Sequence, residues 1–211
     1  MRIDPVSESP DDRSAQFFLY VEGPRDNAIL REWAYRLLPS VARRLFRASV
    51  ILGGRRPARA VEHFRRAGGR EHGIRGLCIL DRDDGAQPVA DSEPGLEFFT
   101  WGRRHIESYL LVPDAICRTL QHAADIPRVQ RALKEHLPAA SDEAAYRCVD
   151  AKRLLAPKGP LPSALGYPIS LHGVARATRW HELHPDVHDV FDRLRERLGV
   201  EDHPIVRPDR S

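Results

Sequence analysis

Lysine is scarce in this sequence of 211 residues. Of 33 basic residues only Lys134, Lys152 and Lys158 are lysines, and the rest are arginines. Because a GC-rich genome produces the same excess of arginine, the composition by itself indicates no particular ligand. The net charge is only +3, which is too small to indicate nucleic-acid binding. Each lysine nevertheless stands out against the arginines, and its position deserves an explanation.

Cysteine and long apolar runs are also scarce. The three cysteines, Cys78, Cys117 and Cys148, are odd in number and form no CxxC pair, which argues against a disulfide framework or a zinc cluster and for a reducing compartment. No apolar stretch approaches the ~18 residues that a membrane helix needs. Residues 1–14 are polar and acidic, unlike a signal peptide. We therefore expect a cytoplasmic protein that makes no membrane contact.

Short apolar runs alternate with amphipathic segments in the first half of the chain. Their lengths and their β-branched and aromatic residues predict buried strands at 17–21, 49–52, 77–80 and 96–101. A helix is predicted to start with Asp26 as its N-cap and to end near Pro39, and a shorter helix follows Pro57. This β-α-β-α-β order predicts a mostly parallel sheet flanked by helices.

The second half of the chain has a helical pattern. We predict helices at 113–122, 126–137, 141–155 and 185–198, with a connection rich in proline and glycine at 157–168. The expected organisation is a flexible lead-in at 1–15, an α/β domain at 16–112, and a helical subdomain at 113–211 that packs on it. The hydrophobic fraction of 42% is sufficient for such a core.

Acidic residues stand where the predicted strands end. Glu22 ends the first strand and Asp26 opens the next helix, Asp81 and Asp83 follow the third strand, and Glu107 comes shortly after the fourth. Ligands of open parallel sheets bind outside the carboxyl ends of the strands. Clustered carboxylates repel one another unless a cation neutralises them, and carboxylate oxygens suit Mg²⁺ or Mn²⁺. A divalent-metal site is therefore predicted at this edge of the sheet.

Three segments resemble a known family. Residues 21–26 (VEGPRD) and 80–83 (LDRD) are similar to the two signature motifs of Toprim domains, which occur in topoisomerases, primases and the OLD (overcoming lysogenization defect) nucleases. Residues 101–111 (WGRRHIESYLL), and the helical half that follows them, resemble the OLD branch of this group. The resemblance implies a Toprim-like, Rossmann-like α/β fold followed by a helical subdomain.

The resemblance also implies a function. Such proteins are endonucleases that hydrolyse DNA phosphodiester bonds with two Mg²⁺ or Mn²⁺ ions, and the corresponding ligands here are Glu22, Asp26, Asp81, Asp83 and Glu107. Glu22 would also help to move protons. Lys152 in the helical half would stabilise charge on the phosphate, as a lysine does in similar nucleases. OLD proteins usually carry an ATPase domain, but this sequence contains no Gly-Lys dipeptide and hence no Walker A loop. An ATPase domain or subunit is therefore an expected partner outside this chain.

Two alternative functions stay open at this point. A haloacid-dehalogenase-like phosphatase also has DxD after an apolar strand, but its usual continuation is DxDGT, whereas Asp84 and Gly85 stand at the positions of that Gly and Thr. A Toprim-like module that binds DNA or a protein partner without catalysis is the second alternative. The complete acidic set favours a nuclease over both.

Overall fold

The sheet has four parallel strands in a computed structural model that describes residues 17–83, 93–120 and 125–201. The strands are β1 (Phe17–Val21), β2 (Val50–Ile51), β3 (Arg75–Leu80) and β4 (Leu96–Thr100). Their order in the sheet is β2-β1-β3-β4, and every neighbouring pair is parallel. The predicted α/β fold with a parallel sheet is confirmed. The predicted lead-in at 1–15 lies outside the described residues.

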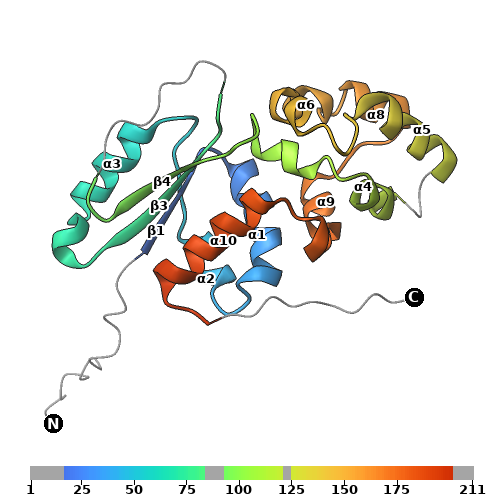
Figure 1. Cartoon of the computed structure of the whole chain (residues 1–211). Helices are drawn as coiled ribbons and strands as arrows, with labels where there is room; N and C mark the ends of the chain where they lie inside the picture. The colour runs from blue at the N-terminus through green and yellow to red at the C-terminus, as the bar shows by residue number, and fades with distance from the viewer. Residues whose placement is uncertain (1–16, 84–92, 121–124, 202–211) are drawn as a thin grey trace, which may run out of the picture.

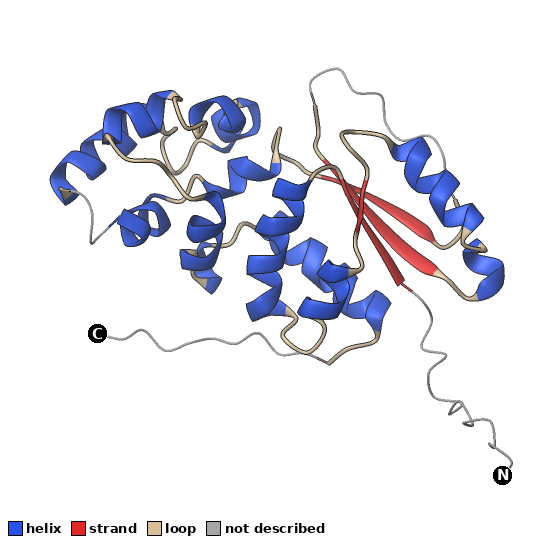
Figure 2. Ribbon diagram, turned by 180° about the vertical axis from the view of Figure 1, so that it is seen from behind, coloured by secondary structure: helices blue, strands red, loops and turns tan. Residues whose placement is uncertain are grey.

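Both faces of the sheet are covered. Successive side chains of a strand point to opposite faces, and here apolar side chains point to both. On β1 and β3, Leu19, Val21, Leu77 and Ile79 point into one core cluster, whereas Tyr20, Cys78 and Leu80 point into the other. The helices α1 (Pro24–Leu37), α2 (Ala42–Arg47) and α10 (Pro185–Leu198) cover the first face, and α3 (Pro57–Arg66) covers the second. Figures 1 and 2 show these two layers on opposite sides of the strands.

The start of α1 differs from the prediction. Gly23 is the N-cap, Pro24 takes the first helical position, and Asp26 lies in the first turn rather than at the cap. Proline suits this place because its missing N–H would have no partner in the first turn of a helix anyway. As a result Asp26 is held on the helix one turn beyond Glu22.

A group of short helices follows the sheet, at the end of the molecule away from α3 (Figure 1). These are α4 (Pro113–Leu120), α5 (Ile126–His136), α6 (Glu143–Cys148), α7 (Ala151–Leu154), α8 (Pro160–Leu165) and α9 (Leu171–Ala177). The single helix predicted at 141–155 is wrong: the chain breaks at Val149 and Asp150, and the Asp150 side chain caps α7. The connection predicted at 157–168 contains α8, because Pro160 stands in its first turn, where proline is tolerated.

The helical part shares the larger core of the α/β part. α9 packs against α1, and α10 packs against β3, so the last helix of the chain returns to the sheet. One core cluster includes residues from β1, α1, α4, α9 and α10. In the described ranges 17–83, 93–120 and 125–201, no helix has both the length and the apolar composition needed to cross a membrane. The division at residue 112 stays a prediction.

Candidate metal centre

Three neighbouring strands end at the same edge of the sheet and deliver the acidic residues there. Glu22 directly follows β1, Asp81 directly follows β3, and the 3-10 helix η3 (Ile106–Leu110), which contains Glu107, begins shortly after β4. Because β1, β3 and β4 are adjacent and parallel, their carboxyl ends converge on one edge, the usual ligand position in such sheets.

Asp81 connects four elements at this edge. Its side chain is 1% exposed. Its Oδ1 accepts a hydrogen bond from the Ile106 N–H at 3.0 Å, and its Oδ2 accepts one from Lys152 Nζ at 2.6 Å. Its own N–H donates to Glu22 Oε1 at 2.8 Å, and its carbonyl oxygen accepts from the Arg55 guanidinium. The side chain of Asp81 therefore holds η3 and α7 to the end of β3, and its backbone N–H connects the end of β3 to the residue after β1.

Glu22 and Asp26 have strongly raised pKa values. Burial raises the pKa of Glu22 from 4.5 to about 7, with further repulsion from Asp81 and Asp83, although the hydrogen bond from the Asp81 N–H opposes the rise. Burial also raises the pKa of Asp26 from 3.8 to about 7, and the charges of Asp81 and Glu107 add to it. Burial and mutual repulsion both make the charged forms of these carboxyl groups costly, and a bound cation would offset that cost.

Glu107 Oε2 and His105 Nδ1, both on the segment after β4, are among the buried polar atoms that have no hydrogen-bond partner within the described part of the chain. The Glu107 side chain is 1% exposed, and its Oε1 receives only a long hydrogen bond of 3.4 Å from Arg25. Burial lowers the pKa of His105, as does the nearby Lys152, so its imidazole is neutral and able to bind a metal. A buried polar atom without a partner is costly, and a metal ion would provide partners for both.

The tightest set of donor atoms comprises Asp81, Asp83 and His105, which each offer one atom, all within 4.8 Å of one another. Asp83 adopts a left-handed φ of 36°, which aspartate tolerates better than most residues. Carboxylate oxygens and a neutral imidazole form a donor set that suits Mn²⁺ and other divalent ions. Sequence reasoning missed His105, although it stands two residues before Glu107 in the segment that resembles OLD proteins.

Lys152 comes to the centre from the helical part. It lies in α7. The Asp150 side chain accepts a hydrogen bond from the Arg153 N–H, and this cap fixes where α7 begins. Burial by itself lowers the pKa of Lys152, but the hydrogen bond to Asp81 and the charges of Asp81, Glu107 and Asp26 raise it overall. The ammonium is therefore firmly charged, and its side chain is still 40% exposed, so that a ligand can reach it.

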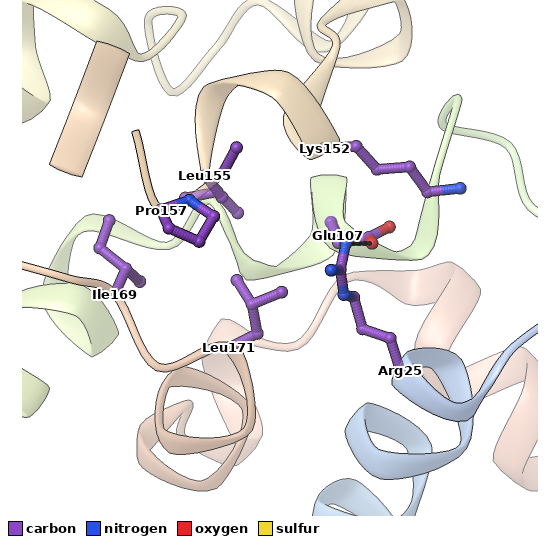
Figure 3. A pocket seen from close by; sticks show the side chains of 8 residues that line it. Arg25, Glu107, Lys152, Leu155, Pro157, Ile169 and Leu171 are labelled. Carbon is purple, nitrogen blue, oxygen red and sulfur yellow. Dashed lines mark hydrogen bonds and ion pairs between the residues drawn. The ribbon is translucent and has the colours of Figure 1, made fainter. Parts of the chain in front are cut away.

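A pocket of about 240 Å³ opens between Glu107 and the helical part. Figure 3 shows Arg25, Glu107 and Lys152 on one side of it, and on the other side aliphatic side chains from the segment after α7, from the segment before α9 and from the first residue of α9. The charged side of the pocket is thus continuous with the candidate metal centre.

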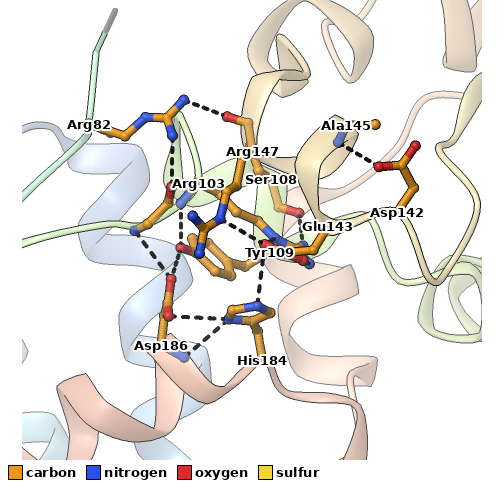
Figure 4. Close-up of polar contacts among 11 residues, drawn as sticks. Arg82, Arg103, Ser108, Tyr109, Asp142, Glu143, Ala145, Arg147, His184 and Asp186 are labelled. Carbon is orange, nitrogen blue, oxygen red and sulfur yellow. Dashed lines mark hydrogen bonds and ion pairs between the residues drawn. The ribbon is translucent and has the colours of Figure 1, made fainter.

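A polar network fixes the segment that carries His105 and Glu107 (Figure 4). Arg103 is 8% exposed and binds Glu143 on α6 through Nε and Nη2, at 3.1 and 2.6 Å, while its Nη1 donates to the Ser108 carbonyl at 2.9 Å. The Tyr109 hydroxyl accepts from the Arg103 N–H at 2.9 Å and donates to Asp186 on α10. The network connects η3 to α6 and α10, and α6 leads directly to α7 with Lys152.

The geometry defines an α/β protein with a four-stranded parallel sheet and, at its carboxyl edge, an acidic group that could bind a metal. No protein-family model matches the chain, and no curated protein matches its sequence.

Two solved structures have the same fold. The C-terminal region of the Burkholderia pseudomallei OLD protein matches with a TM-score of 0.52 and 14% identity, over 87% of this chain and 98% of that chain. The C-terminal region of the Xanthomonas campestris pv. campestris OLD protein matches with a TM-score of 0.50 and 16% identity, over 90% and 98%. The resemblance to the OLD branch is therefore confirmed at the level of the fold.

The five predicted ligands have different positions in this arrangement. Asp81 and Asp83 belong to the tight donor set with His105. Glu22, Asp26 and Glu107 surround that set closely enough to interact with it electrostatically. A centre shared by all five stays a prediction.

Proposed function

We propose that this chain is a metal-dependent nuclease that hydrolyses DNA phosphodiester bonds with two Mg²⁺ or Mn²⁺ ions. The observation that supports the proposal best is the Lys152 ammonium, which lies 2.6 Å from Asp81 inside an acidic cluster on an OLD-type fold. A cluster of carboxylates beside a cation that solvent can reach is suited to an anionic substrate whose charge increases during reaction.

The residues that would hold the ions are Glu22, Asp26, Asp81, Asp83 and Glu107, with His105 added by the structure. Their buried oxygens, the raised pKa values and the unpartnered Glu107 Oε2 and His105 Nδ1 all fit bound divalent cations. When bound, such ions supply an activated water and stabilise the attacking and leaving oxygens of a phosphodiester.

The protein side chains then have separate tasks. Lys152 offers a compact ammonium to the phosphate, which a wider guanidinium would not fit in the same way. Glu22, with a pKa of about 7, is able both to accept and to release a proton near neutral pH. The Arg103 network holds Glu107 and Lys152 in a fixed relation, because it joins η3 to the helix that precedes α7.

An ATPase domain or subunit is part of the proposal. The two matching structures are C-terminal regions of OLD proteins, and OLD proteins usually carry an ATPase domain as well. We propose that this chain works beside such an ATPase. That partner would hydrolyse ATP, because this chain contains no Walker A sequence.

The test is cleavage of supercoiled plasmid by the purified chain in Mg²⁺, Mn²⁺ or EDTA. We expect nicked or degraded DNA with either metal, none in EDTA, and none with Asp81→Ala. The control is Glu32→Gln, which removes the charge of another buried carboxylate, one that pairs with Arg176 on α9 outside the centre. Release of phosphate from small phosphomonoesters without DNA cleavage would favour a phosphatase, and binding of DNA without hydrolysis of either would favour an interaction module.

A further inference from the structure

The pocket beside Glu107 has an apolar half that the hydrolysis of a phosphodiester does not itself require. Its aliphatic wall consists of Leu155, Ala156, Pro157, Ile169 and Leu171. Ala156, Ile169 and Leu171 are half-buried and Pro157 is exposed, so these side chains face a space open to a ligand. Such a wall, with a few charged groups at one end, is the usual composition of a small-molecule site.

The charged half determines which way a ligand would lie. Arg25 and Lys152 are the cations of the pocket, and Lys152 is also in contact with Asp81 of the candidate metal centre. The exposed Arg25 guanidinium adjoins Glu107, with its side chain 57% exposed. An anionic group at this end and an apolar group against the aliphatic wall would satisfy both halves of the pocket (Figure 3). A nucleotide combines two such groups, its phosphate and the face of its base.

The size of the pocket limits what fits. Its volume of about 240 Å³ lies below the range of roughly 300–1,000 Å³ typical of sites for drug-sized ligands. One planar base fits such a space more readily than a base pair. We propose that this pocket receives the unpaired base of a nucleotide beside the cleaved phosphate, an inference that rests on the proposed nuclease function.

The substrate class follows from the chemistry of the wall. A base inside a duplex is stacked and paired, so it reaches a pocket of this kind only in single-stranded, frayed or flipped DNA. Aliphatic side chains contact the face of any base but read none of its hydrogen-bonding edge. The chain therefore prefers unpaired DNA and discriminates little among the four bases.

Binding of a short single-stranded oligonucleotide that contains 2-aminopurine tests this inference separately from cleavage. We expect the fluorescence of 2-aminopurine to change when the purified chain binds in Ca²⁺, and the matching duplex to bind more weakly. Ala156→Phe fills the pocket, so it should weaken single-strand binding about tenfold, as the loss of one base contact does, and remove the fluorescence change. Leu171→Ala, which shortens part of the wall and enlarges the pocket instead of filling it, should weaken binding less.

The matched control is Ala164→Phe, which enlarges another half-buried alanine of the helical part, on α8 and outside the pocket. It should bind like the unaltered chain, and melting temperatures establish that each variant is folded. A normal fluorescence change in folded Ala156→Phe and Leu171→Ala, or equal binding of duplex and single strand, would overturn the pocket proposal even if plasmid cleavage is intact. A fluorescence change that depends on the pocket, without any DNA cleavage, would instead overturn the nuclease and leave the base-binding pocket standing.

Discussion

Replacement of Lys152 by methionine probes the contact between the helical part and the centre. The ammonium donates to Asp81 Oδ2 at 2.6 Å, and the Asp81 side chain is 1% exposed. Methionine keeps most of the aliphatic stem and removes the charge. The buried carboxylate then loses the donor to its Oδ2, while the Ile106 N–H still donates to Oδ1.

The size of the effect follows from the burial of the two partners. Breaking a fully buried ion pair costs roughly 3–5 kcal/mol. The Lys152 side chain is 40% exposed, so solvent screens the pair, and we expect a loss of only about 1–3 kcal/mol in EDTA. In a chain of this size, each kcal/mol corresponds to roughly 2–4 °C of melting temperature. The melting temperature should therefore fall by about 2–12 °C.

Melting curves and plasmid cleavage together test the reasoning. Millimolar Mn²⁺ should raise the melting temperature of Lys152→Met at least as much as that of the unaltered chain, because a bound cation replaces the missing charge. Cleavage should fall by about 10²–10³-fold, the cost of removing one group that stabilises charge in the transition state. Lys152→Arg should keep the stability and lose much of the cleavage. An unchanged melting temperature in EDTA would refute the contact, and full cleavage by Lys152→Met would refute its role in the reaction.

Three further predictions concern charge at the centre and its support. Because burial raises the pKa of Glu22 to about 7, its contribution to stability is lost as pH rises from about 4.5 to above 7. In EDTA, Glu22→Gln should therefore be more stable than the unaltered chain at pH 8, by up to about 3 kcal/mol, and equally stable at about pH 4. Glu32→Gln should be less stable than the unaltered chain at pH 8, because the hydrogen bond from Arg176 lowers the pKa of Glu32. The same pH dependence of stability in both variants would refute the assignment of these two pKa shifts. Asp83→Asn should raise the metal-free stability by on the order of 1 kcal/mol, since one like charge is removed, and should shrink the Mn²⁺-induced rise in melting temperature; an undiminished rise would exclude it as a ligand. Arg103→Lys should lower the melting temperature and cleavage together, because lysine cannot reproduce the paired hydrogen bonds to Glu143 and the bond to Ser108; unaltered cleavage would show that the network does not support the centre.

The strand and helix pattern of the first half could be predicted because it depends on local rules. Four apolar runs of strand length, each ending in polar or turn residues, place the strands to within two residues of their observed ends. The order of strands and helices then requires parallel pairing. The short helices were less predictable: α2 in the first half and α8 and α9 in the second were missed, because helices of six or seven residues have little room for a periodic pattern. Only packing against other elements stabilises helices this short.

The sequence by itself determined which acidic residues stand at the carboxyl edge. In a parallel sheet, the residue that follows each strand comes to the same edge, so Glu22, Asp81 and Glu107 could be grouped without coordinates. The composition also set apart the three lysines, of which Lys152 is one, since lysine is rare here.

Only the tertiary structure decided which of these side chains meet. Lys152 reaches Asp81 across 71 positions of the chain, and His105 joins Asp81 and Asp83 because the segment after β4 folds back over the end of β3. The base-sized pocket likewise exists only where α7 and α9 close against Glu107. Such contacts depend on packing between distant segments, and no local pattern encodes them, because local patterns record only which face of an element is buried.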